Sequence, residues 1–120
     1  MSQNGCRVGL FSIGLAAYWP QFDGLEQRLT SYGAFVAKKL SDMGIEVVDV
    51  GMVDDQPKAM AAGDRFIREG VDLVVCYVTT YSTSSQVLPA VQQVGRPVLV
   101  LNLQPTAQLQ YVATGTGEWL

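Results

Sequence analysis

The densest group of side chains that could contact a ligand is a run of hydroxyls from Thr79 to Ser85, where six of the seven residues are Ser or Thr. The exception is Tyr81, which carries a phenol. Neutral hydroxyls donate and accept hydrogen bonds, which suits a ligand that has hydroxyls of its own. They also cap helices. We expect Thr83, Ser84 and Ser85 to cap the helix that follows, and Tyr81 to contact a ligand.

The residues most often used for acid–base catalysis and metal binding are scarce in this chain. The chain has no histidine, which removes Ser-His and Cys-His catalysis and the commonest metal ligand. Cys6 and Cys76 form no C-x-x-C motif, and we expect both to be buried, reduced thiols. Asp54 and Asp55 are paired, but a lone acidic pair lacks the further oxygen ligands of a hard cation, so we expect solvated loop residues. The sequence therefore predicts no catalytic residue, no metal site and no cofactor in this chain.

Composition narrows the class of protein further. The chain has 120 residues, 48% apolar and 16% charged, with a net charge of −3. This length and balance predict one globular domain. The absence of a basic cluster argues against nucleic-acid binding, and no apolar run is long enough to span a membrane. The N-terminus lacks the pattern of a signal peptide, so we expect a cytoplasmic protein.

Strands and helices must position these residues, and their pattern alternates strictly. Apolar, β-branched segments predict four strands, at 7–13, 45–50, 71–78 and 96–101. Between them, apolar residues at three- and four-residue spacing predict helices at 24–44, 56–70 and 86–94. Pro89 is expected to lie in the first turn of the last helix or to kink it. The apolar stripe of the first helix comprises Leu25, Leu29, Tyr32, Phe35, Val36, Leu40 and Met43.

This alternation predicts an α/β fold: a flavodoxin-like or Rossmann-like parallel sheet with strand order 2-1-3-4 and helices on both faces. Residues 1–120 are expected to form a single domain, with 105–120 as a partial strand or a linker towards later domains. Ligands of such sheets bind beyond the carboxyl ends of the strands, near the switch point between strands 1 and 3. The loops at 14–24, 79–85 and 102–108 are therefore the candidate binding segments.

The residues in these loops favour a sugar over a phosphate-bearing ligand. The turn after strand 1 has one glycine and two bulky aromatics, so it lacks the glycine-rich pattern that binds a dinucleotide. Neutral hydrogen-bonding groups beside flat apolar faces suit the hydroxyls and C–H faces of a sugar or polyol. The expected rim comprises Tyr18, Trp19, Gln21, Thr79, Thr80, Tyr81, Ser82, Asn102 and Gln104.

From Arg7 to Gln104 the order of segments resembles the N-terminal domain of the L-arabinose and L-fucose isomerase family, of the arabinose-isomerase type. The clearest pieces are "TTYSTSSQVLPAVQQVGRPVLVLNLQP" and the aromatic loop after "GLFSIG". The family's Thr-aromatic-Ser loop corresponds to residues 80–82 here, and its Lys/Arg-Pro pair to residues 96–97. The first loop departs from the arabinose-isomerase pattern: Ala16 replaces an expected glutamine, and residues 17–19 replace His-Leu-Tyr. The resemblance therefore leaves the particular sugar open.

The resemblance implies that this chain is the substrate-side and oligomerisation domain of an aldose–ketose isomerase, part of a longer homo-oligomeric protein. It implies sugar contacts from Tyr81 and Gln104, with Tyr18 and Trp19 in the first loop. It also implies a divalent metal, usually manganese, and acid–base carboxylates in later domains. The 120-residue segment alone is then expected to be inactive. The alternative is a stand-alone flavodoxin-like binding or regulatory module for a sugar or nucleotide, which the length of the open reading frame would distinguish.

Overall fold

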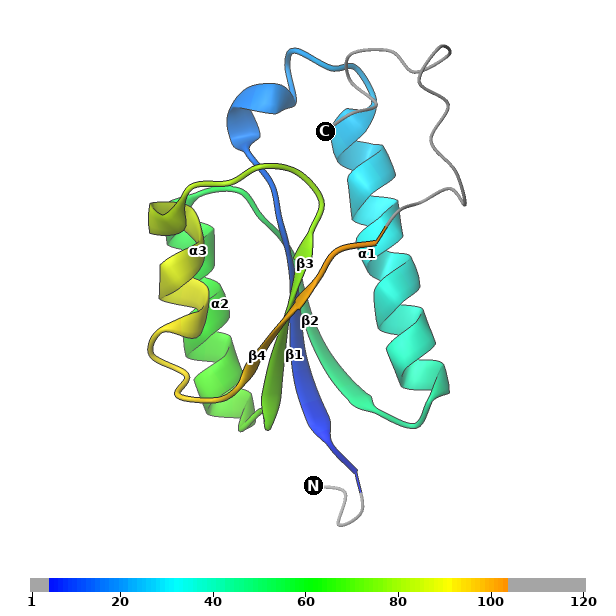
Figure 1. Ribbon diagram of the computed structural model, residues 1–120, viewed down its shortest axis with the longest axis vertical. Helices are drawn as coiled ribbons and strands as arrows, with labels where there is room; N and C mark the ends of the chain where they lie inside the picture. Colours follow the sequence, from blue (N-terminus) through cyan, green and yellow to red (C-terminus); the bar gives the residue numbers. More distant parts are fainter. Residues whose placement is uncertain (1–4, 104–120) are drawn as a thin grey trace.

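Apolar strands and amphipathic helices alternate along the chain as expected (Figure 1). The computed structural model describes residues 5–103. The elements in this range are β1 (Arg7–Ile13), the 3-10 helix η1 (Ala16–Tyr18), α1 (Leu25–Asp42), β2 (Glu46–Val53), α2 (Gln56–Glu69), β3 (Leu73–Val78), α3 (Ser84–Val91) and β4 (Val98–Leu101). The expectation for residues 105–120 lies outside the described range.

The described strands form one parallel sheet in the order β2-β1-β3-β4, which confirms the expected topology. Helix α1 covers one face of the sheet, and α2 and α3 cover the other (Figure 1). This is the α/β arrangement of flavodoxin-like and Rossmann-like domains. From β1 the chain adds β2 on one side, and it then adds β3 and β4 on the other side. The loops after β1 and β3 therefore lie next to each other at the switch point of the sheet.

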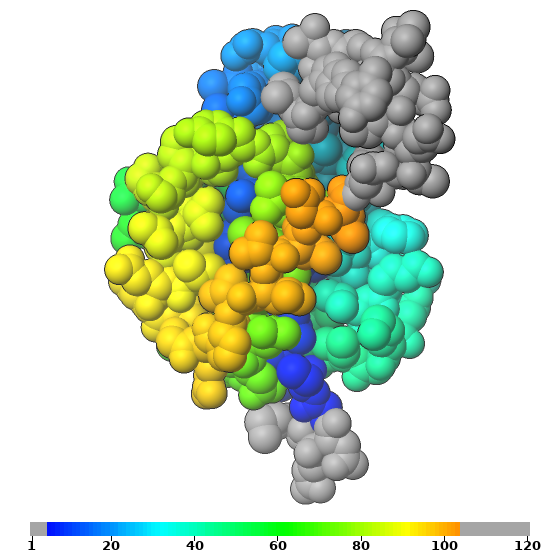
Figure 2. Space-filling view, in the orientation of Figure 1, coloured from blue at the N-terminus to red at the C-terminus, as the bar shows by residue number. Residues whose placement is uncertain are grey.

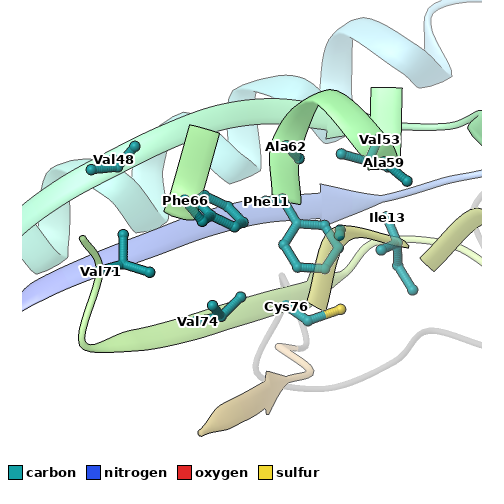
Figure 3. Packing of buried hydrophobic residues seen from close by; sticks show 11 residues of the cluster. Phe11, Ile13, Val48, Val53, Ala59, Ala62, Phe66, Val71, Val74 and Cys76 are labelled. Carbon is teal, nitrogen blue, oxygen red and sulfur yellow. The ribbon is translucent and has the colours of Figure 1, made fainter. Parts of the chain in front are cut away.

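The two apolar cores follow from the alternation of side chains along β1. Val8 and Leu10 join the cluster that includes Val36 of α1. Phe11 points to the opposite face and packs near Phe66 of α2, with ring centroids 6.1 Å apart (Figure 3). Strands that bury both faces need the nearly continuous apolar sequence that this chain shows.

β2 is longer than its sequence predicts because a bulge lies within it. The register with β1 shifts between Leu10 and Ser12, whose partners on β2 are Asp49 and Met52. Gly51 adopts a positive φ of 79°, and its amide donates to Asp49 Oδ1 at 2.9 Å. A glycine at a bulge lets the strand absorb an extra residue and continue. β2 therefore runs on to Val53, which places residue 54 directly at the strand end.

The apolar stripe of α1 is only partly buried. Leu25, Leu29 and Val36 are buried, whereas Phe35 and Met43 of the same stripe are exposed. Gly33 takes part of this face instead. A Cβ at Gly33 would lie 2.7 Å from Ser12 Oγ of β1, so the glycine allows the helix to approach the sheet closely.

A similar close approach joins α2 to α3. A Cβ at Gly63 would lie only 2.5 Å from the carbonyl oxygen of Pro89. Pro89 lies inside α3 because the helix begins at Ser84, two residues earlier than expected. It therefore lies beyond the first turn, where proline cannot donate the usual bond to the carbonyl four residues earlier.

The edge strand β4 is apolar and yet largely exposed. Val98, Leu99 and Val100 all have exposed side chains, and the strand runs across the visible surface in Figure 2.

The two cysteines differ in burial. Cys6 is exposed, so its expected burial is wrong, whereas Cys76 is buried as expected. Among residues 5–103, no helix is long and apolar enough to cross a membrane.

Candidate functional site

Three loops meet at the carboxyl edge of the sheet. They are the first loop (residues 14–24, after β1), the turn between β2 and α2, and the hydroxyl loop (residues 79–83, between β3 and α3). Because the strands are parallel, all three loops leave the same edge, and Figure 1 shows them at one end of the molecule. This edge is where ligands of open α/β sheets bind.

Most of the hydroxyl loop is occupied with internal hydrogen bonds. The Thr79 hydroxyl donates to the carbonyl oxygen of Ile13 at the end of β1. Thr80 is buried, and its hydroxyl donates to the carbonyl oxygen of Tyr81 at 3.0 Å. The Thr79 bond holds the loop against the sheet, whereas the Thr80 bond lies within the loop. The density of Ser and Thr is therefore explained mainly by the loop's own structure.

The far end of the loop is fixed by a helix cap. Thr83 is the N-cap of α3 and forms a capping box with Gln86, whose Oε1 accepts from the Thr83 amide at 3.3 Å. Ser82 Oγ donates to the same oxygen at 3.1 Å. The expected capping role thus falls to Thr83. Ser84 and Ser85 are instead the first residues of the helix, and Ser85 Oγ lies 3.0 Å from Thr83 Oγ1.

Tyr81 is the exception in this loop. Its side chain is 63% exposed, although both neighbouring segments are fixed. An aromatic ring exposed on a well-anchored loop presents an apolar face at little entropic cost to binding. Tyr81 is therefore the residue here that best suits a ligand contact.

The first loop folds back through the short helix η1. Tyr18 is half-buried and contacts Phe22 edge to face, with ring centroids 6.1 Å apart. Gln21 is exposed, and its side-chain amide donates to the carbonyl oxygen of Ala17 at 2.7 Å. This local bonding gives the loop a defined shape at the carboxyl edge.

Trp19 connects this loop to the end of β2. Its indole Nε1 donates to Asp54 Oδ2 at 2.7 Å, and Asp54 Oδ1 accepts from Lys58 Nζ at 2.7 Å. The Asp54 side chain is only 4% exposed, whereas that of Lys58 is 52% exposed. The expectation that Asp54 is a solvated loop residue is therefore wrong. The bulge in β2 is the reason, because it carries the strand to Val53 and draws the next side chain inward.

Asp55 differs from its neighbour. It is the N-cap of α2, and its Oδ1 accepts from the Lys58 amide at 2.8 Å. It is half-buried rather than fully solvated. The paired acidic residues thus have separate structural roles, one as an ion pair and one as a helix cap.

The electrostatics of Asp54 favour its charged form. Burial by itself raises the pKa of this carboxyl, but the hydrogen bonds from Lys58 and Trp19 and the charge of Lys58 outweigh it. The net pKa is lowered from the ordinary value of 3.8. The hydrogen bond to Asp54 correspondingly raises the pKa of Lys58. Both partners are therefore ionised at neutral pH.

The other expected site residues divide between exposed and undescribed positions. Asn102 is exposed beyond β4, and Gln104 lies outside the described residues.

Burial raises the pKa of the Cys76 thiol to about 11, so this thiol is not a nucleophile at neutral pH. Within residues 5–103, no group of three or more His, Cys, Asp or Glu side chains could hold a metal ion.

Sequence reasoning missed the cluster of Asp54, Lys58 and Gln86. Gln86 of α3 donates from Nε2 to the Asp54 carbonyl oxygen at 3.4 Å, so the first loop, α2 and α3 are joined at one residue. A partial signal was present in the sequence, since Asp and Lys four residues apart are typical of an ion pair at the start of a helix. The partner Trp19 carries no such signal, because it is 35 residues away.

No protein-family model, no curated protein and no solved structure matches this chain. The fold and the arrangement of the carboxyl edge are therefore the basis for any functional proposal.

Proposed function

We propose that this chain is the substrate-side domain of a sugar isomerase-like protein, and that its carboxyl edge contributes contacts to an aldose or ketose. The observation that carries the proposal is the exposure of Tyr81 on a loop whose own hydroxyls are already bonded. A folded protein gains little stability from an aromatic ring in that position, whereas a sugar gains a flat apolar surface.

The surrounding groups support a neutral, hydroxyl-rich ligand. Tyr18 supplies a second aromatic ring in the first loop, and Asn102 and Gln21 are exposed amides. Asp54, the one buried carboxylate among residues 5–103, is already paired with Lys58. A ligand that needs a strong charge partner is thus less suited to this edge than a sugar.

The chemistry of isomerisation belongs to other parts of the proposed protein. Residues 5–103 contain no group of three or more His, Cys, Asp or Glu side chains that could hold a metal ion, and the chain has no histidine, so these residues do not fit the manganese that the family resemblance implies. The proposed roles of this chain are contact with the sugar and, through the parent protein, assembly into an oligomer.

Calorimetric titration of the chain with a panel of pentoses and hexoses tests the proposal. We expect binding of at least one aldose or ketose, and loss of that binding in Tyr81→Ala. Phe35→Ala is the matched control, since Phe35 is also an exposed aromatic, at 58%, but lies on α1. Equal sugar affinity of the wild-type and Tyr81→Ala chains would refute the proposed contact, and binding of nucleotides in place of sugars would favour the binding-module alternative.

A further inference from the structure

Asp54 forms a junction between segments that the sequence keeps far apart. Its side chain bonds Trp19 of the first loop and Lys58 of α2, and its carbonyl oxygen accepts from Gln86 of α3. The side chain is almost fully buried. The first loop, the start of α2 and the start of α3 are therefore all connected through one residue at the end of β2.

The ring of Trp19 is held by packing, in addition to the hydrogen bond from its nitrogen. A Cβ at Gly14 would lie 2.9 Å from Cη2 and Cζ2 of Trp19, and 2.9 Å from the sulfur of Met52. The indole thus lies directly against the backbone at the end of β1. Because its one polar atom is bonded to Asp54, a rotation of the ring would leave a buried carboxylate with one donor fewer.

Only the Asp54 side of this ion pair is buried, and the cost of removing its charge from water offsets much of the attraction to Lys58. The pair instead fixes the orientation of the Asp54 carboxylate. Because Oδ1 is bonded to Lys58, Oδ2 lies at a defined position, where it accepts from Trp19 Nε1. That donor belongs to the loop that carries Tyr18.

We propose that Asp54 is a positioning residue for the first loop: held by Lys58, it fixes the indole of Trp19 and thereby the conformation in which the loop presents Tyr18. The link to sugar binding rests on the proposed function above, but the link to the loop does not. Asp54 acts through Trp19 and does not itself contact the ligand.

The test compares Asp54→Asn with Asp42→Asn in a Trp119→Phe background, in which Trp19 is the remaining indole. Asp42 is a matched control because it also pairs with a lysine four residues away, at 3.1 Å, but on the exposed surface of α1. The readouts are the indole N–H resonance of Trp19 and the hydrogen exchange of amides 14–22. Neither readout depends on ligand.

We expect Asp54→Asn to shift the indole resonance and to speed exchange in the loop roughly tenfold to hundredfold, the range for loss of a charge-assisted hydrogen bond. Asp42→Asn should change neither. An unchanged resonance and unchanged loop exchange in Asp54→Asn would overturn the inference. If Asp54→Asn does not fold, Trp19→Phe removes the Nε1 donor together with part of the ring: faster loop exchange then supports the inference, and wild-type exchange refutes it.

Sugar titration of the same variants separates the two proposals. Weaker sugar binding in Asp54→Asn, with normal binding in Asp42→Asn, supports positioning for the ligand. A loosened loop in a chain that binds no sugar even as wild type would retain Asp54 as the positioning residue and refute the proposed function. Wild-type sugar affinity with a loosened loop would overturn the link between the loop's conformation and binding.

Discussion

The charged Asp54 side chain is buried, and hydrogen bonds from two donors compensate for its lost hydration. Lys58 supplies an opposite charge and Trp19 a neutral hydrogen bond, both at 2.7 Å. Hydrogen bonds to a charged group contribute more than neutral ones, and removal of the charge leaves the donors without an equal partner.

We expect Asp54→Asn to lower the free energy of unfolding by about 1.5–3 kcal/mol near neutral pH. Since folding lowers the pKa of this carboxyl, its contribution is present above the ordinary value of 3.8 and is lost as the pH falls through the lower folded-state pKa. The difference between wild type and variant should therefore shrink below about pH 4. Urea denaturation at several pH values measures it, and a difference that is constant from pH 7 to pH 3 would contradict this explanation.

Gly14 determines whether Trp19 can occupy its position. We expect Gly14→Ala to displace the indole, because the new methyl group would contact both the ring and Met52 at 2.9 Å. In the Trp119→Phe background, where the fluorescence comes from Trp19, the variant should lose the native tryptophan fluorescence maximum and unfold at a lower temperature. Gly24→Ala tests a first-loop glycine with open space around it, so its effect should come from its positive φ of 77° and not from the indole. Native tryptophan fluorescence in Gly14→Ala would show that the indole is not held there.

At the scale of elements, the hydroxyl loop is a fixed connection rather than a flexible one. One end is bonded to β1 through Thr79, and the other to the first turn of α3 through the capping box of Thr83 and Gln86. Tyr81 lies between these two anchors. A loop held in this way presents a side chain without a large loss of entropy on binding.

The capping box leads to a prediction that distinguishes among the three consecutive hydroxyls. Thr83→Ala should lower stability by about 0.5–2 kcal/mol, as expected for loss of an N-cap. Ser84→Ala, one residue into the helix, should change it by less than about 0.5 kcal/mol, as at most surface sites. Thermal or urea denaturation measures both. A larger effect of Ser84→Ala than of Thr83→Ala would place the helix start elsewhere.

The sequence predicts these elements well where periodicity alone decides them. The apolar runs of β1 and β3 are examples, since a strand covered on both faces is apolar throughout. The stripe of α2 is another, since a helix that packs on a sheet has apolar residues along one face. It fails where a single backbone feature changes the outcome. The positive φ of Gly51 extends β2 by three residues past the expected end at residue 50, and no hydrophobic pattern reveals that bulge. The burial of Asp54 follows from this extension and was missed with it.

At the scale of the whole molecule, the parallel order β2-β1-β3-β4 brings the first loop and the hydroxyl loop to one edge. This topology followed from the alternation of strands and helices and from right-handed crossovers. The bond from Trp19 to Asp54 did not, because a contact between side chains 35 residues apart depends on the final packing. The sequence could therefore identify the edge but not the junction at Asp54.

The proposed division of labour predicts that this chain alone has no isomerase activity. Proton transfer between adjacent sugar carbons needs an acid–base group or a metal at the substrate. The chain has no histidine, and the carboxylate of Asp54 at this edge is paired with Lys58. We expect no interconversion of any pentose or hexose, with or without manganese, above a no-protein control. A coupled assay for ketose formation measures this. Turnover by the purified chain would show that the catalytic groups lie within it.

The most direct test of the central claim is to locate the sugar on the chain by two-dimensional amide NMR during titration with the best-binding aldose or ketose. We expect shifts concentrated in residues 14–22 and 79–85, at the carboxyl edge, with the largest changes around Tyr81. Amides at the opposite edge, around residues 44–46 and 70–72, should remain unchanged. Shifts confined to that opposite edge, or to the exposed strand β4, would contradict the account.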